Sequence, residues 1–286
     1  MTLRGCASAC GAGTIINAIA TWKGSAFAID LRTTAEVELG EDMKRIQGEI
    51  KGGGDATLIE RCVELVLQKF GYAGGAHVRT SSEIPIARGL KSSSAAANAT
   101  VLATLSALDK KMEALEAVRL GVHAALDVGV TVTGAFDDAA ASFLGGIVVT
   151  NNKTMQLVKR VERDEDVLIL VPEEKVFTAE TNVEKMKLIA PWVELAYDLA
   201  LEDRFEKAMT LNGILYCVAL EFDPCIIIKA LEAGASGASL SGTGPAFCAL
   251  VKKDRISAVK EAWSDFNGKI IRTKINNEGA RVERCR

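Results

Sequence analysis

Residues Pro85–Ala95 read PIARGLKSSSA, a glycine-containing loop that runs directly into a predicted helix beginning with three serines. The first backbone N–H groups of a helix have no partner within the helix, and the helix dipole places partial positive charge there. With the serine hydroxyls, these groups form a cradle for an anion such as phosphate. The loop is not a Walker A loop, because the pattern GxxxxGK[ST] occurs nowhere in the chain. An ordinary alanine-rich helix with a serine cap would show the same local chemistry.

A second segment, Gly134–Gly146, reads GAFDDAAASFLGG and holds two adjacent aspartates in small, apolar surroundings. Carboxylates are seldom buried unless they are paired or bound to a cation. Asp137 or Asp138 could therefore orient a nucleophilic hydroxyl group, or take the proton from it. An Asx-type turn or a helix cap would explain the same residues equally well.

A third segment, Gly234–Phe247, reads GASGASLSGTGPAF and leads into a predicted strand. Glycines let the backbone approach a ligand closely because they have no Cβ atom. One glycine-rich loop is weak evidence by itself, since ordinary turns have the same composition. Gly11–Gly13 is weaker still as a dinucleotide-binding signal, because no clear strand precedes it.

Predicted helices and strands alternate along the rest of the chain, which favours an α/β or α+β protein in two halves. Strands are expected at residues 26–39, 76–81, 142–150, 167–171, 246–251 and 269–274. Helices are expected at residues 55–70, 92–108, 113–127, 183–201, 203–221, 224–233 and 254–266. The polar segment 151–166 is the best candidate for the junction between the halves, although a solvated hairpin explains it nearly as well.

The composition excludes several classes of protein. The chain has 286 residues, 49% of them hydrophobic, which is ample for one large domain or two ordinary ones. Its net charge of -3 argues against a nucleic-acid partner. The sequence shows neither the apolar region of a signal peptide nor a run long enough to span a membrane, and so predicts a cytoplasmic protein with no membrane partner.

The cysteines and histidines predict neither a disulfide framework nor a metal centre. The seven cysteines are odd in number and contain no CxxC pair, so we expect small buried side chains in a reducing compartment. His77 and His123 lie far apart in sequence with no second ligand at metal spacing, and are expected to be ordinary core or surface residues.

Taken together and in this order, the three segments resemble the GHMP kinases, a superfamily named for galacto-, homoserine, mevalonate and phosphomevalonate kinases. The pattern PxxxGLKSSSA matches the family's phosphate loop, usually PxxxGLGSSAA, with Lys91 at a position where glycine is usual. TGAFDDAAAS resembles the segment that carries the catalytic aspartate, and SLSGTGPAF resembles the third glycine loop. Within the superfamily, the opening ACGAGTIINAIATWKGSAFAIDL is similar to that of the archaeal-type shikimate kinases.

The resemblance implies the α+β fold of the GHMP kinases. It implies an N-terminal domain over residues 1–160, similar to the second domain of ribosomal protein S5, and a ferredoxin-like domain over residues 161–286. The active site would lie between them. The implied activity is the use of ATP and magnesium to phosphorylate the 3-hydroxyl of shikimate, a small-molecule substrate. Homoserine kinase is the nearest enzymatic alternative, and a non-catalytic GHMP relative that senses a metabolite is another.

Site residues carried over from the family fall on particular positions. The catalytic aspartate falls on Asp138, with Asp137 as the competing choice. The magnesium-binding carboxylate, eleven positions earlier in mevalonate kinases, falls on Asp127, and the loop serine that helps to hold magnesium falls on Ser93. Retention of both Asp127 and Asp138 favours an enzyme over a sensor.

The resemblance also implies which residues bind ATP. The expected ATP-binding residues are Pro85, Gly89, Leu90, Lys91, Ser92, Ser93, Ser94, Ala95, Gly242 and Gly244. A cation is needed for the substrate carboxylate, and arginine suits it because it can donate two parallel hydrogen bonds. Arg88 is one candidate, although a solvated loop charge explains it at least as well. Further candidates are Arg4, Arg32, Lys23 and Lys91.

Overall fold

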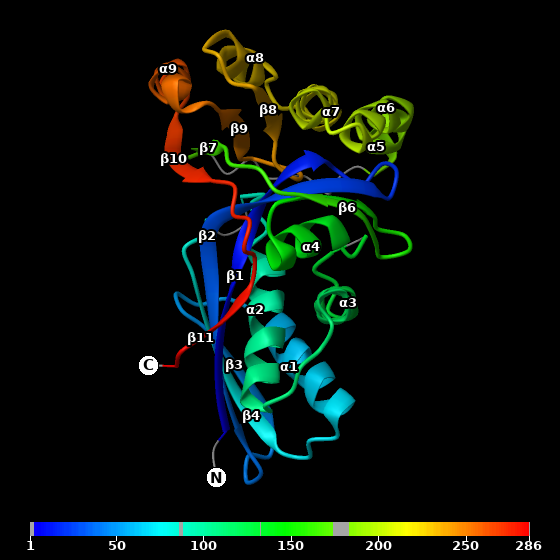
Figure 1. The fold of residues 1–286 in the computed structure, drawn as a ribbon, viewed down its shortest axis with the longest axis vertical. Helices are drawn as coiled ribbons and strands as arrows, with labels where there is room; N and C mark the ends of the chain where they lie inside the picture. The colour runs from blue at the N-terminus through cyan, green and yellow to red at the C-terminus, as the bar shows by residue number, and fades with distance from the viewer. Residues whose placement is uncertain (1–2, 86–87, 132, 174–182, 286) are drawn as a thin grey trace.

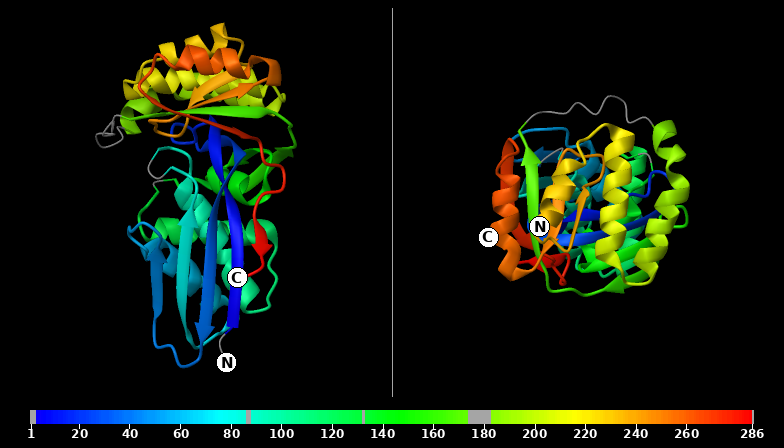
Figure 2. Two further views of the ribbon diagram at one scale, coloured as in Figure 1. Left: turned by 90° about the vertical axis from the view of Figure 1, so that its left-hand side faces the viewer. Right: turned by 90° about the horizontal axis from the view of Figure 1, so that it is seen from above.

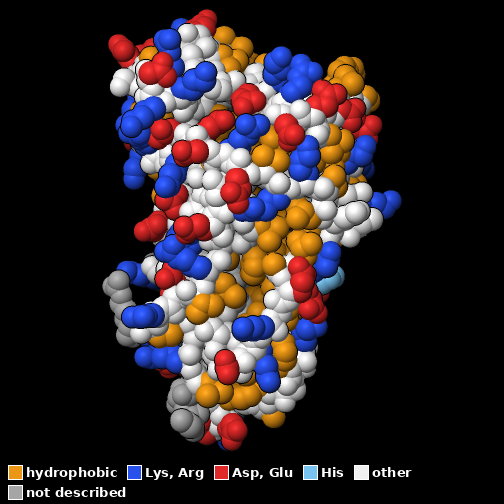
Figure 3. All heavy atoms as spheres, viewed as in Figure 1, with side chains coloured by type: hydrophobic (Ala, Val, Ile, Leu, Met, Phe, Trp, Pro, Cys, Tyr) orange, Lys and Arg blue, Asp and Glu red, His pale blue; other side chains and the backbone are white. Residues whose placement is uncertain are grey.

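Two β-sheets organise the protein in the computed structural model, which describes residues 3–85, 88–131, 133–173 and 183–285. A seven-stranded sheet with its helices forms the lower part of the molecule in Figure 1, and a four-stranded sheet with its helices forms the upper part. No helix among the described residues is long and apolar enough to cross a membrane. Acidic and basic side chains are interspersed over the face drawn in Figure 3, as the small net charge predicts.

The seven-stranded sheet has the order β11-β1-β2-β4-β3, and β5 and β6 extend it from β2. Its strands are β1 (Leu3–Ile16), β2 (Lys23–Gly40), β3 (Ile46–Ile50), β4 (Gly75–Ser82), β5 (Ile147–Asn151), β6 (Gln156–Val161) and β11 (Arg281–Glu283). Its helices are α1 (Thr57–Phe70), α2 (Ser92–Ala107), α3 (Ala114–Asp127) and α4 (Phe136–Leu144). The helix α2 lies against β1 and β2, and α1, α3 and α4 pack around it (Figure 1).

The four-stranded sheet is antiparallel throughout, with the order β10-β7-β9-β8. Its strands are β7 (Asp166–Pro172), β8 (Gly237–Leu240), β9 (Phe247–Val251) and β10 (Gly268–Lys274). Its helices are α5 (Val183–Leu188), α6 (Ala190–Leu201), α7 (Phe205–Leu220), α8 (Cys225–Glu232), the 3-10 helix η1 (Lys253–Arg255) and α9 (Ile256–Trp263). These helices cover the outer face of the sheet (Figure 2). The largest hydrophobic core joins this sheet to residues of β1 and β2, including Ile15 and Phe27.

The strand β1 was not predicted, because its sequence of Gly, Ala, Cys and Ser has low β-propensity. Close packing explains the small residues. A Cβ atom on Gly13 would lie 2.3 Å from the ring of Phe27, and one on Gly5 would lie 2.1 Å from the carbonyl oxygen of Ala103 in α2. The strand β8 was also missed, since it lies inside the predicted glycine loop.

Most predicted helices are present, with ends shifted by a few residues. The helix α1 ends at Gly71 in the left-handed conformation, as predicted. The prediction of a strand over 142–150 was wrong at its start, because the helix α4 continues to Leu144 before β5 begins. The segment 151–166 contains β6, which pairs with β5, so the hairpin alternative is the one observed there.

The end of the chain returns to the first sheet. β11 pairs with β1, and Cys285 forms a disulfide with Cys6, with 5.3 Å between their Cα atoms. The expectation that all seven cysteines are buried thiols was therefore wrong. Cys6 and Cys285 are 279 residues apart in sequence, so their proximity could not be predicted from the sequence. Cys225 is exposed, and the remaining free cysteines are buried.

The division into domains at residue 160 stays a prediction. The chain passes between the sheets over residues 162–165.

Candidate active site

The phosphate-loop candidate forms one wall of a cavity of about 450 Å³. The helix α2 begins at Ser92, so the three serines occupy its first turn and leave their N–H groups unpaired within the helix. The residue at the N-cap is Lys91, in the left-handed conformation (φ 63°, ψ 35°), without a side-chain cap. The alternative of an ordinary helix capped by serine is therefore not observed, since the serines follow the N-cap. Gly89, with φ 77°, turns the chain just before it.

The third glycine loop docks on the phosphate loop. The hydroxyl of Ser241 donates to the carbonyl oxygen of Gly89 at 2.7 Å, and a Cβ atom on Gly89 would lie 2.1 Å from the carbonyl oxygen of Ser241. The N–H of Gly242 donates to the hydroxyl of Thr14 in β1 at 2.8 Å. These contacts join the two sheets at the mouth of the cavity, and they require glycine at residue 89.

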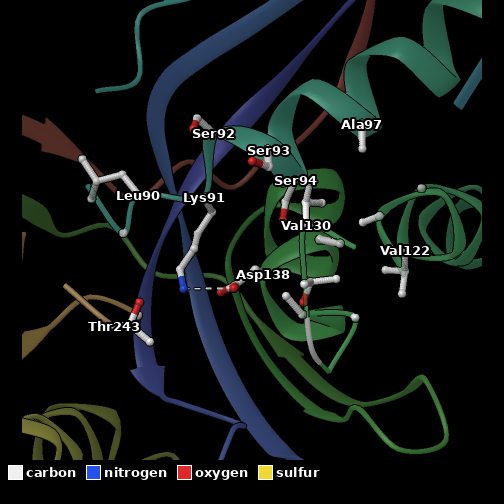
Figure 4. Close-up of a pocket in the computed structure, with 18 of the residues that line it drawn as sticks. Leu90, Lys91, Ser92, Ser93, Ser94, Ala97, Val122, Val130, Asp138 and Thr243 are labelled. Atoms are coloured by element: carbon white, nitrogen blue, oxygen red, sulfur yellow. Dashed lines mark ion pairs between the residues drawn. The ribbon is translucent and has the colours of Figure 1, made fainter. Parts of the chain in front are cut away.

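Both aspartates of the second segment lie in the first turn of α4 and are buried. One carboxylate oxygen of Asp138 lies 2.9 Å from the ammonium of Lys91 (Figure 4). The other, Oδ1, is buried without a hydrogen-bond partner among the described residues. An unpartnered buried carboxylate oxygen is costly, and the ion pair of Lys91 with the other oxygen offsets part of that cost.

Asp137 has a different environment. Its Oδ1 accepts a hydrogen bond from Asn152 at 2.7 Å, and its Oδ2 packs against Gly24, where a Cβ atom would lie only 2.5 Å away. Burial, and then the neighbouring charge of Asp138, raise the pKa of Asp137 to about 7, and the charge of Lys91 opposes this rise. The two adjacent carboxylates thus differ: Asp137 is held by Asn152 and lines the second cavity alone, and Asp138 is paired with Lys91 and lines both cavities.

A second cavity of about 390 Å³ adjoins the first. Residues that line both cavities are Lys91, Val130, Thr131, Ala135, Asp138, Gly242 and Thr243. In Figure 4 the side chains of Lys91 and Asp138 point toward each other from α2 and α4, with Thr243 of the third loop nearby. Two ligands bound side by side would therefore meet at the Lys91–Asp138 pair.

The structure brings most of the predicted site residues together. The first cavity is lined by Arg88, Gly89, Leu90, Lys91, Ser92, Ser93, Ser94, Asp138, Gly242 and Gly244, and the second by Asp137 and Asp138 as well as Lys91 and Gly242. Pro85 and Ala95 line neither cavity, and Ala95 is fully buried in the core beneath α2. Their inclusion among the ATP-binding residues stays a prediction that the cavity linings do not support.

Asp127 is not in the site. It lies at the C-terminal end of α3, where Arg61 of α1 forms an ion pair with it at 2.7 Å, and it lines neither cavity. The role of metal ligand that the family spacing implied stays a prediction, and the position of this carboxylate beside Arg61 of α1 does not favour it. A cluster of three His, Cys, Asp or Glu side chains that could hold a metal is absent from the described residues.

Arg88 lines the first cavity and not the second. Its guanidinium donates to the carbonyl oxygen of Pro172 in β7 at 3.1 Å, so it also ties the phosphate loop to the second sheet. This position suits a contact with the ligand of the first cavity better than one with the ligand of the second.

Several polar residues of the second cavity were missed. Thr14, Asn17, Thr131, Thr133 and Thr243 line it. The side chain of Asn17 donates to the carbonyl oxygen of Gly242 at 3.0 Å, and its backbone N–H donates to Asn212 of α7 at 3.1 Å. The only local signal for Asn17 is an amide within the apolar run TIINAIA.

Comparisons with known proteins show which family the chain matches. Residues 57–146 match the family model described as the GHMP kinases N terminal domain, and residues 198–269 match the one described as GHMP kinases C terminal. The chain is 61% identical over 284 residues to a protein named shikimate kinase from Methanosarcina mazei, covering 98% of this chain and 97% of that protein. It is 44% identical over 275 residues to a protein of the same name from Halobacterium salinarum, covering 95% and 96%.

Solved structures show a similar fold at low identity. A homoserine kinase from Cytophaga hutchinsonii has a TM-score of 0.77 and 18% identity, with 98% of this chain and 97% of that chain covered. A mevalonate kinase from Methanococcus jannaschii has a TM-score of 0.73 and 18% identity, with 96% and 98% covered. At this identity the likeness concerns the fold alone.

Proposed function

Because the chain belongs to the GHMP kinases and is an ATP-dependent kinase, we propose that it transfers the γ-phosphoryl group of ATP to the 3-hydroxyl of shikimate. The relatives named shikimate kinase are 44–61% identical over nearly the whole chain. The homoserine and mevalonate kinases share the fold at 18% identity. This contrast favours shikimate over the other acceptors, and the kinase names favour turnover over a sensing role.

The observation that carries the proposal is that Asp138, ion-paired with Lys91, lines both cavities. We place ATP in the first cavity, with its phosphates against the start of α2 and the third glycine loop, and shikimate in the second. Free N–H groups, the helix dipole and serine hydroxyls favour the triphosphate there. The hydroxyl to be phosphorylated then lies between the carboxylate of Asp138 and the γ-phosphorus.

The proposed step is a direct in-line transfer. The substrate hydroxyl gives its proton to the carboxylate of Asp138, and its oxygen forms a bond to the γ-phosphorus. The bond between that phosphorus and the bridging oxygen breaks, and its electron pair leaves with ADP. Positioning of the two reactants and stabilisation of the developing charge supply most of the rate in such transfers.

Magnesium fits the first cavity through oxygen donors. Mg²⁺ prefers oxygen ligands and usually keeps several waters, so one or two protein ligands beside the phosphates suffice. The hydroxyls of Ser92, Ser93 and Ser94 line this cavity, and we keep Ser93 as the proposed ligand. When bound, the ion would neutralise charge on the phosphate oxygens. We also propose that the protein acts in the cytoplasm, where ATP is available to a kinase.

The proposed role of Ser93 as a magnesium ligand can be tested by comparing it with Asp127. Ser93→Ala is expected to raise the Mg²⁺ concentration needed for half-maximal rate, because it removes an oxygen ligand. Asp127→Asn should leave this concentration unchanged, since Asp127 is paired with Arg61 outside both cavities. The measurement is a Mg²⁺ titration at fixed ATP and acceptor. A shift caused by Asp127→Asn and not by Ser93→Ala would restore the family spacing and contradict the placement described above.

The acceptor is tested by an ADP-release assay with shikimate, homoserine and mevalonate as separate substrates. Turnover is expected with shikimate, with little or none for the other two. Clear turnover of homoserine without turnover of shikimate would overturn the substrate assignment and leave the family assignment standing.

A further inference from the structure

Lys91 and Asp138 are the charged residues among the described residues that line both cavities. Their side chains are 14% and 9% exposed, and the ammonium lies 2.9 Å from Oδ2 of the carboxylate. An ion pair so well shielded from water interacts far more strongly than one at the surface. It also occupies the place where a phosphoryl donor and its acceptor would meet.

The backbone at Lys91 shows that this lysine is held under strain. Its left-handed conformation is unfavourable for a residue with a Cβ atom, and glycine would adopt it at no cost. Strained non-glycine residues cluster at functional sites, where the side chain is used. The backbone turn directs the side chain of Lys91 away from its own helix and toward α4 (Figure 4).

The third glycine loop leaves the space that the ammonium needs. A Cβ atom on Gly242 would lie 2.7 Å from Nζ of Lys91, so any larger residue there would displace the ammonium. Three separate segments therefore fix its position: the phosphate loop by its backbone, α4 by its carboxylate and the third loop by its lack of a side chain.

We propose that Lys91 is a catalytic residue whose ammonium contacts both Asp138 and the transferring phosphoryl group. This inference rests on the proposed function. An anionic base and an anionic phosphoryl group repel each other when a hydroxyl lies between them, and a cation beside both cancels that repulsion. As the proton moves to the carboxylate of Asp138 and the oxygen bonds to phosphorus, the ammonium stabilises charge on the phosphoryl oxygens.

Lys91→Met tests the charge at nearly constant size. We expect kcat to fall by about 10²–10³, the scale of one lost electrostatic contact with a transition state. The KM values for ATP and shikimate should change by less than about threefold, because binding in the ground state rests on the other residues of each cavity. Lys69→Met is the matched control, since it removes another ion-paired lysine, on the exposed surface between α1 and α3, and should leave kcat unchanged.

Lys91→Gly keeps the test decisive if the methionine variant folds poorly, because glycine suits φ 63°. We expect it to fold and to lose as much kcat as Lys91→Met. Ethylammonium added to this variant should restore part of kcat in a saturable way, and tetramethylammonium, which has no N–H donor, should not.

Other results would overturn the inference. A large rise in the KM for ATP or for shikimate with kcat unchanged would make Lys91 a binding residue for phosphate or for the substrate carboxylate. Wild-type kinetics in a folded Lys91→Gly variant, or no response to ethylammonium, would also contradict a catalytic ammonium. If the wild type phosphorylates a different acceptor, the proposed function fails separately, and the same variants are measured with that acceptor.

Discussion

Asp138→Asn is expected to lower kcat by about 10²–10⁴, the scale of a lost general base. Asparagine keeps the size of the side chain and can still accept a hydrogen bond, but it cannot take the proton from the substrate hydroxyl. Asp138 lies at the junction of the two cavities, so ATP binding in the first should survive. The measurements are steady-state kinetics with shikimate and a separate binding titration with ATP.

Asp137→Asn is the matched comparison, and its effect should be milder. The carboxylate of Asp137 is committed to Asn152 and packed against Gly24, and an asparagine oxygen can still accept the hydrogen bond. If Asp137→Asn abolishes turnover while Asp138→Asn retains a near-normal rate, the assignment of the base is wrong by one residue.

Gly242→Val is expected to lower kcat/KM by about 10²-fold, the scale of a misplaced catalytic contact. Gly242 has φ 62°, and its missing side chain leaves room for the ammonium of Lys91. A β-branched side chain would displace the ammonium and narrow the cavity where the phosphates are proposed to bind. The measurements are ATP affinity, kinetics and a thermal unfolding curve.

Gly71→Val separates backbone strain from contact. Gly71 ends α1 with φ 66°, and a Cβ atom there would meet nothing within 4 Å. The substitution Gly71→Val therefore imposes a similar conformational cost on the backbone without contacting either cavity. The kinetics of this variant should stay near those of the wild type. Equal losses in both variants, or normal ATP binding in Gly242→Val, would make the third loop a plain turn.

The sequence predicted the parts of the site whose chemistry is local. A glycine turn before three serines predicts an anion cradle without reference to the rest of the chain, and Gly89 and Ser92 lie where that reading puts them. Two aspartates among alanines predict a buried acidic site for the same reason. Helices with strong periodicity, such as α1, were also predictable.

Contacts between distant segments could not be predicted. The pairing of Lys91 with Asp138 depends on how α2 and α4 pack, and the closing disulfide of Cys6 depends on a strand from the other end of the chain. The ion pair of Asp127 with Arg61 could not be predicted either, because a spacing carried over from relatives does not state which way the last turn of a helix faces. The second cavity could not be predicted from the sequence because β1 contributes to its lining. The small residues of β1 are explained only by the side chains and helices that pack against the strand.

The position of the new phosphate ester on the product tests the central claim most directly. The wild-type protein is incubated with ATP, Mg²⁺ and shikimate, and the product is examined by correlating phosphorus with proton signals in an NMR spectrum. The account predicts one new phosphorus signal coupled to the proton on C3 of the ring, and its formation should be lost in Asp138→Asn. Coupling to the proton on C4 or C5, or release of inorganic phosphate with no phosphorylated shikimate, would contradict it.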